Sequence, residues 1–293
     1  MSIQLLISGI SLGAVYALVA VGFAVVFSVM KFSNFAHGGM ISACAYAAFY
    51  FQRAFTPPPP IYITILFSAA FGVLLSLVID TIAYRRLRTK QSPNIYYFLA
   101  SITMSILIVN FLTIFYGKNL YAFPPIFSST TFHIGSIRFS SMDTLILLIS
   151  LGILAILVFF IDKTRVGLAI RSVAINPQVS KLMGINPDVT IMTVFAIAGA
   201  LAGISGVLLA MKLSVYPTLG SQMMIKGFVA SVIGGLGSLS GAIIAAIFLG
   251  IFEIFLTFYL GSLSTPIVLF GAMLVFLAVR PSGIAGRFAQ EKV

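Results

Sequence analysis

The chain has 293 residues, of which 60% are hydrophobic and only 8% are charged. Because soluble globular domains carry about 25% charged residues, this composition excludes a water-soluble enzyme or binding module. The net charge of +11 would suggest nucleic acid binding in a soluble chain. Here most lysines and arginines flank apolar segments, as they do in the cytoplasmic loops of membrane proteins, so we expect the lipid membrane as a partner and no nucleic acid.

Segments without charge recur along the chain, and most are long enough to cross about 30 Å of hydrocarbon as a helix. They predict an all-α polytopic membrane protein with eight to nine transmembrane helices, two of them short or broken. The predicted segments are 5–30, 37–52, 61–84, 95–116, 142–161, 189–211, 221–235, 241–260 and 265–279. The short second and seventh segments could instead be half-helices that line a cavity. The basic residues of 85–90 and 162–188 predict cytoplasmic loops, which places the N-terminus outside.

A weak internal repeat divides the chain. Gly9 and Gly13 in the first segment match Gly199 and Gly203 in the sixth, and each pair precedes a polar break and a short segment. Because five segments precede the second copy, the pattern predicts an inverted repeat. The single transmembrane domain, 1–293, would comprise a first repeat (5–116), a linking span (142–161), a cytoplasmic loop (162–188) and a second repeat (189–279). The alternative is that these small residues only let helices approach closely.

The cytoplasmic stretch from Thr164 to Pro187 reads TRVGLAIRSVAINPQVSKLMGINP. It predicts two short amphipathic helices under the membrane, the second beginning at Pro177 and ending at Gly184. The stretch resembles the loop with which permease subunits of ABC importers dock on their ATP-binding subunits. That resemblance implies a role in ATPase coupling for Arg171, Asn176, Pro177 and Gly184. The alternative is an ordinary cytoplasmic linker.

Two further motifs narrow the resemblance: SNFAHGGMISACAYAAF from Ser33 to Phe49, and IKGFVASVIGGLGSLSGAI from Ile225 to Ile243. Both look like the branched-chain amino acid permease family of ABC importers, of the LivH type, and the order of motifs agrees over essentially the whole chain. The resemblance implies a permease subunit in a bacterial inner membrane that moves branched-chain or related neutral amino acids by alternating access. It also implies separate ATP-binding subunits, a second LivM-like permease subunit and an extracytoplasmic substrate-binding protein.

Two alternatives stay open. A urea or short-amide permease of the same family would show the same motifs. An ion-coupled secondary transporter would fit the hydropathy, but it would not need the cytoplasmic loop.

Charged residues inside apolar segments point to the transport path. Lys226 and Glu253 are the clearest cases, and each costs roughly 2.5 to 3.5 kcal/mol at the centre of a membrane. Their similar expected depth predicts an ion pair beside the path. The alternative is that Lys226 extends to the membrane surface and Glu253 bonds a neighbouring hydroxyl. The family resemblance adds further residues at the two breaks: Asn34, His37 and Gly38 at the first, and Gly234, Gly235 and Gly237 at the second.

No catalytic, cofactor or metal site is predicted. His37 lacks a partner carboxylate, His133 falls in an external loop, and Cys44 is the single cysteine. The glycines at 234–237 are not followed by the Lys-Ser or Lys-Thr of a phosphate-binding loop, so ATP hydrolysis is expected on a separate subunit. Outside, TFHIGSIRF (131–139) predicts a hairpin turning at Gly135 and Ser136, a possible contact for the binding protein.

Overall fold

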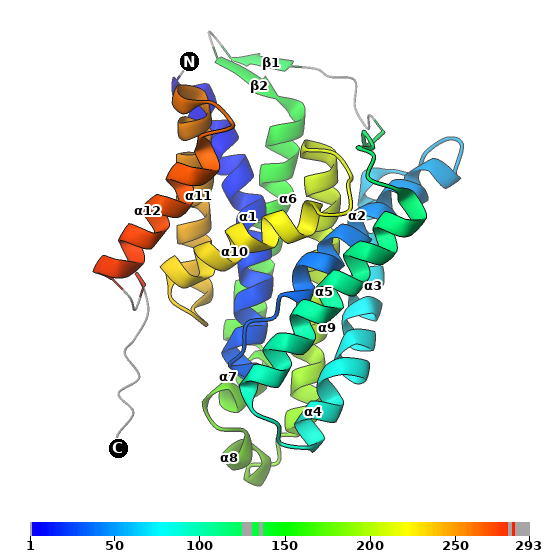
Figure 1. The fold of residues 1–293 in the computed structure, drawn as a ribbon, viewed down its shortest axis with the longest axis vertical. Coiled ribbons are helices and arrows are strands. Elements are labelled where there is room, and N and C mark those ends of the chain that lie inside the picture. The colour runs from blue at the N-terminus through cyan, green and yellow to red at the C-terminus, as the bar shows by residue number, and fades with distance from the viewer. Residues whose placement is uncertain (1, 125–130, 135–136, 281–282, 285–293) are drawn as a thin grey trace.

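The computed structural model describes residues 2–124, 131–134, 137–280 and 283–284 (Figure 1). The first half contains α1 (Ser2–Met30), α2 (Ala36–Ala54), α3 (Ile61–Ile79), the π-helical turn η1 (Asp80–Tyr84), α4 (Arg85–Thr89) and α5 (Asn94–Tyr116). A hairpin of β1 (Thr131–Ile134) and β2 (Ile137–Ser140) follows. The second half contains α6 (Ser141–Lys163), α7 (Arg165–Ile175), α8 (Pro177–Leu182), α9 (Pro187–Lys212), α10 (Leu219–Gly234), α11 (Leu239–Leu260) and α12 (Thr265–Val279).

The predicted helical membrane fold is confirmed. Every predicted apolar segment corresponds to a helix whose ends lie within a few residues of the prediction, because hydrocarbon leaves the backbone no partners outside the segment. Within the described part of the chain, six helices are long and apolar enough to cross a membrane: α1, α3 with its extension to Thr89, α5, α6, α9 and α11. The helices α10 and α12 are shorter, and in Figure 1 α10 lies across the bundle instead of along it.

The core forms around α1 and α9, the two most buried of these spans. Both helices are apolar on all sides, which is the pattern of a helix surrounded by others. The remaining spans surround them and expose large apolar side chains on their outer faces.

Glycines bring α1 against α11 and α3 against α9. A methyl group added at Gly13 would collide with the backbone of Ile247, and one added at Gly203 would collide with the carbonyl group of Ser68. Gly72 and Gly199 likewise meet backbone to backbone. Each glycine pair of the predicted repeat therefore packs on a helix of the opposite half. The inverted repeat stays a prediction, and this reciprocal packing supports it.

The two ends of the molecule differ. Figure 1 shows the N-terminus and the β1–β2 hairpin at one end and α4, α7 and α8 at the other, the arrangement that the charge pattern predicts. The strands pair antiparallel from Thr131 opposite Ser140 to Ile134 opposite Ile137, which confirms the predicted hairpin. Its predicted turn residues, Gly135 and Ser136, lie outside the described residues.

Candidate functional site

The first break lies between α1 and α2. Asn34 is buried, and its Oδ1 accepts a hydrogen bond from the backbone N–H of Ala36 at 3.2 Å and from the Tyr84 hydroxyl at 2.8 Å. The side chain therefore fixes the first turn of α2 and ties it to the end of η1. Lys31, the first residue of the break, has a φ of 56°, a backbone conformation that non-glycine residues rarely adopt.

The beginnings of α2 and α10 cross at a backbone contact. A methyl group added at Gly220 would collide with the carbonyl oxygen of Gly38, and the N–H of Gly220 donates to Ser42 Oγ at 2.8 Å. A methyl group at Gly38 would in turn meet Met224 and Gly220. The helices that follow the two breaks therefore meet inside the bundle, which the separate motifs could not reveal.

His37 is buried on α2, and its ring lies against Gly22 of α1. Neither ring nitrogen has a hydrogen-bond partner in the described residues. No group of three or more potential metal ligands occurs among those residues either. This position suits a packing role for His37 between α2 and α1.

Lys226 and Glu253 form the predicted ion pair. Lys226 Nζ lies 2.5 Å from Glu253 Oε1, and their side chains are only 19% and 14% exposed. Tyr16 completes the cluster: its hydroxyl donates to Glu253 Oε2 at 3.0 Å and accepts from Lys226 Nζ at 2.9 Å. Three helices, α1, α10 and α11, thus meet at one charged network. The alternative in which each charge is satisfied separately is wrong.

Two further ion pairs, one partly buried and one largely buried, were not predicted from the sequence. Lys212 Nζ lies 2.8 Å from Asp143 Oδ1 at the hairpin end of the bundle. Arg88 bonds both carboxylate oxygens of Asp80 at 2.6 and 3.1 Å near the opposite end. Asp143, Lys212 and Arg88 stand at or just beyond the ends of predicted spans, and Asp80 lies about one turn inside such an end, where a charge is ordinary. The signal in the sequence is that residues of opposite charge stand near span ends at the same expected depth in the membrane.

The glycines at 234–237 form the tight turn between α10 and α11. Gly235 and Gly237 have φ values of 102° and 86°, which side-chain-bearing residues rarely adopt. A methyl group at Gly234 would collide with the backbone of Gly241. These glycines therefore allow a turn and close packing.

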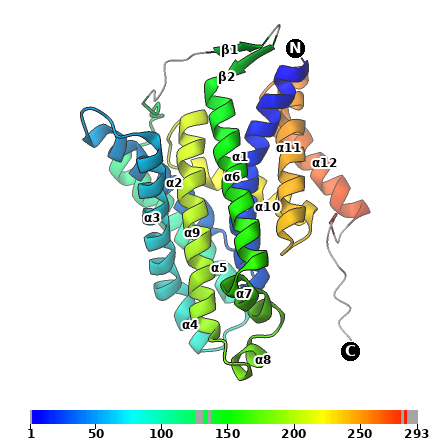
Figure 2. The same cartoon turned by 180° about the vertical axis from the view of Figure 1, so that it is seen from behind.

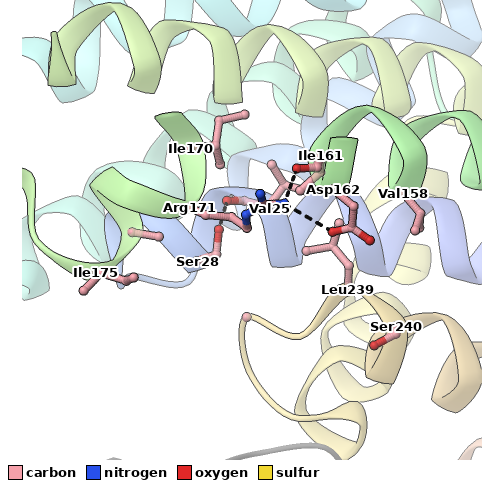
Figure 3. Close-up of a pocket in the computed structure, with 12 residues that line it drawn as sticks. Val25, Ser28, Val158, Ile161, Asp162, Ile170, Arg171, Ile175, Leu239 and Ser240 are labelled. Carbon is pink, nitrogen blue, oxygen red and sulfur yellow. Dashed lines mark hydrogen bonds and ion pairs between the residues drawn. The ribbon is translucent and has the colours of Figure 1, made fainter. Parts of the chain in front are cut away.

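A cavity of about 380 Å³ separates this turn from α7 (Figure 3). Its walls include Ser28 of α1, Arg171 of α7, and Gly237 and Ser240 of the turn and α11. Arg171 points to the end of α6, where its Nη1 donates to the Ile161 carbonyl at 2.6 Å and reaches Asp162 at 3.5 Å. Arg171 thus anchors α7 to α6 beside the turn between α10 and α11.

The predicted pair of short helices is present as α7 and α8, and α8 ends at Leu182, two residues before the predicted end. Asn176 Oδ1 accepts from the N–H groups of Gln178 and Val179, and Pro177 occupies the first turn of α8. Gly184 ends this region with a φ of 82°, and a methyl group there would meet nothing within 4 Å. The pair exposes large apolar side chains at the tip of the molecule: Ile175, Leu182 and Met183.

Together, a bundle of apolar helices, two helices that follow chain breaks and cross inside it, and a partly buried charge network define a polytopic membrane protein. Residues 5–278 match the family model described as branched-chain amino acid transport system / permease component, and the chain belongs to this family.

Three curated relatives match over nearly the whole chain. The high-affinity branched-chain amino acid transport system permease protein LivH of Escherichia coli strain K12 is 32% identical, over 99% of this chain and 97% of that protein. LivH of Salmonella typhimurium is 31% identical with the same coverage, and the corresponding protein BraD of Pseudomonas aeruginosa is 31% identical over 99% of this chain and 98% of that protein. The chain is therefore a multi-pass membrane permease, consistent with a bacterial inner membrane.

A solved structure supports the fold. A chain of PsaBC from Streptococcus pneumoniae in complex with Fab superposes with a TM-score of 0.51 and 15% sequence identity. The match covers 95% of this chain and 91% of that one. At this identity the likeness concerns the arrangement of helices alone.

Proposed function

We propose that the chain is the transmembrane subunit of an ABC importer that moves branched-chain or related neutral amino acids by alternating access. The observation that carries this proposal is the match over nearly the whole length of chain and relatives, whose names state branched-chain amino acid transport. A path for such a solute must accept a zwitterion with an apolar side chain and reject ions.

The Lys226–Glu253–Tyr16 cluster suits that requirement. The two charges neutralise each other, so the cluster offers hydrogen-bonding groups without a net charge that would favour an ion. Lys226 of the cluster lies on α10, whose first turn crosses α2 at Gly38, so the cluster, Asn34, His37 and the two breaks would line or flank the path. A path for phosphates or charged sugars would need fixed counter-charges, since desolvating an unpaired ion is costly.

The helix pair α7–α8 would receive the ATP-binding subunit. Leu182 and Met183 are 87% and 77% exposed at the end that the basic loops assign to the cytoplasm. Exposed apolar side chains that lie close together are typical of a docking surface. Asn176 and Pro177 would fix the start of α8, Gly184 its end, and Arg171 the position of α7 on the bundle.

The other subunits follow from this assignment. ATP hydrolysis would take place on the separate subunits that bind α7–α8, and a second LivM-like permease subunit would complete the path. The β1–β2 hairpin at the opposite end would contact an extracytoplasmic substrate-binding protein.

Uptake by a strain that lacks the gene tests the substrate. We expect loss of ATP-dependent uptake of radiolabelled leucine, isoleucine and valine at low concentration, restored by a plasmid copy. Normal uptake of these three with loss of urea uptake would favour the urea or short-amide alternative. Uptake that follows an ion gradient instead of ATP would favour a secondary transporter, which α7–α8 argue against.

A further inference from the structure

The outer end of the bundle contains a second charge network that the transport path does not include. Asp143 lies in the first turn of α6, directly after the hairpin (Figure 2). Its Oδ1 contacts Lys212 Nζ at 2.8 Å, and its Oδ2 accepts from Ser8 Oγ at 3.1 Å. Ser11 Oγ donates to the backbone carbonyl of Asp143 at 3.0 Å and accepts from Lys212 Nζ at 3.3 Å. The network therefore joins α6, α1 and α9.

Lys212 is the last residue of α9 and stands at the start of the second break. Ser214, two residues on, holds a φ of 151°, a strained conformation for a residue with a side chain. Val215 then exchanges both backbone hydrogen bonds with Tyr121, at 2.8 and 2.9 Å. The second break is thus held at Lys212 on one side and at Val215 on the other, with the strained Ser214 between them. The helix α10 begins directly after the break.

The same helix α1 touches both charge networks. Ser11 bonds the Asp143–Lys212 pair, whereas Tyr16 bonds the Lys226–Glu253 pair one to two turns further along. A displacement of the hairpin would therefore reach α10 by two routes, through the break and through α1. Side-chain exposures of 15% for Lys212 and 20% for Asp143 keep their attraction strong, because it is weakly screened by water.

We propose that the Asp143–Lys212 pair, with Ser8 and Ser11, is an external clamp that transmits displacement of the β1–β2 hairpin to the second break and α10. The role given to the hairpin, contact with a binding protein, rests on the proposed function. The contacts that form the clamp do not depend on it. Lys212 and Asp143 act as positioning residues, since their contacts are with other helices and with the break.

A thiol reporter tests the mechanical part without any substrate. In a Cys44→Ala background, Ser214→Cys places a half-buried thiol in the break. Asp143→Asn should raise its labelling rate by a polar maleimide severalfold, and the charge-exchanged double variant Asp143→Lys with Lys212→Asp should restore slow labelling. Asp80→Asn breaks a buried ion pair at the other end and serves as the matched control, with no change expected at Ser214→Cys.

A second readout tests the role in transport. In the reconstituted complex, Asp143→Asn should abolish stimulation of ATP hydrolysis by loaded binding protein while basal hydrolysis persists, and the charge exchange should restore stimulation. If Asp143→Asn fails to fold, Ser8→Ala removes one bond of the clamp without leaving a charge unpaired, and it should give a partial loss of stimulation.

Unchanged labelling at Ser214→Cys in both Asp143→Asn and Ser8→Ala would overturn the clamp. Equal loss of stimulation in Asp80→Asn would also contradict it, because the effect would then be general destabilisation. A wild-type complex that no binding protein stimulates would contradict the proposed function, whereas the labelling result would still decide whether the clamp exists.

Discussion

Lys226 and Glu253 stay inside an apolar bundle because each satisfies the other and Tyr16 bonds both. Taking the charges out of water is costly, and removal of one partner leaves the other uncompensated. The pair is therefore expected to show strong coupling between its two members.

Single and double substitutions test that coupling. Lys226→Met or Glu253→Gln should each lower thermal stability of the purified permease, by up to about 3 to 5 kcal/mol for a fully buried pair and less here, because both side chains retain some exposure. The double variant should recover part of the loss. Lys118→Met, at an exposed lysine, is the control. Additive losses in the double variant would mean that the two residues act separately.

Tyr16 offers a milder change in the same network. Tyr16→Phe removes the hydroxyl that bonds Glu253 and Lys226 but keeps the ring, so stability should fall by roughly 1.5 to 3 kcal/mol, the range for hydrogen bonds to charged groups. Tyr62→Phe, at a tyrosine that is 69% exposed, should have no effect. Thermal unfolding of both variants in the same detergent measures the effect. Equal melting temperatures would show that the Tyr16 hydroxyl does not stabilise the network.

Charge inside an apolar run is the signal that predicted Lys226 and Glu253. Tyr16 carries no charge and lies among apolar residues, so its only signal is that a buried hydroxyl needs a partner. Asp143 and Lys212 were missed for a different reason. Charges at span ends are expected in any membrane protein, and only the packing of α6, α1 and α9 shows that these two meet.

Helix ends and breaks were predicted well because they depend on local residues. The Asn-Pro pairs at 176–177 and 186–187 do cap α8 and α9, and the predicted amphipathic pair is present. Crossings between helices depend on residues far apart in the chain. The contact between Gly38 and Gly220 follows from the three-dimensional arrangement and has no local signature.

The helix pair α7–α8 gives a direct test of coupling. Leu182→Glu places a charge on an exposed apolar residue, so folding and insertion should be unchanged. Binding of the ATP-binding subunits should fall strongly, because the charge must be desolvated in a docking groove. Gln91→Glu adds the same charge to another exposed residue at this end and should leave binding unchanged. Pull-down of the complex measures both, and normal binding by Leu182→Glu would place the docking surface elsewhere.

Packing of α3 on α9 depends on glycine. Gly199→Leu would force apart two backbones that touch at Gly72, so we expect a destabilisation at or above the 1 to 3 kcal/mol typical of overpacked cores. Gly152→Leu on α6 is the matched control, since a methyl group at Gly152 meets nothing within 4 Å. Thermal unfolding of the two variants makes the comparison. Equal stability would contradict the close packing of α3 and α9.

The whole molecule combines a closely packed core around α1 and α9 with two different ends. Its helical membrane fold follows from composition and from the spacing of charges, since hydrocarbon permits few other structures. The reciprocal packing of α1 with α11 and of α3 with α9 supports the predicted inverted repeat. The paired glycines in the sequence were equally compatible with ordinary close packing of helices. The charges beside the proposed path cancel, which fits a neutral or zwitterionic solute without selecting one amino acid among such solutes.

Transport by purified components tests the central claim most directly. The permease would be reconstituted in liposomes with its ATP-binding subunits, the second permease subunit and the binding protein, and uptake of radiolabelled leucine measured with ATP supplied to the ATP-binding subunits. We predict uptake that requires ATP hydrolysis, is competed by isoleucine and valine, and is lost in Leu182→Glu. Leucine uptake that proceeds without ATP under an ion gradient, or ATP-driven uptake of urea in place of leucine, would contradict the account.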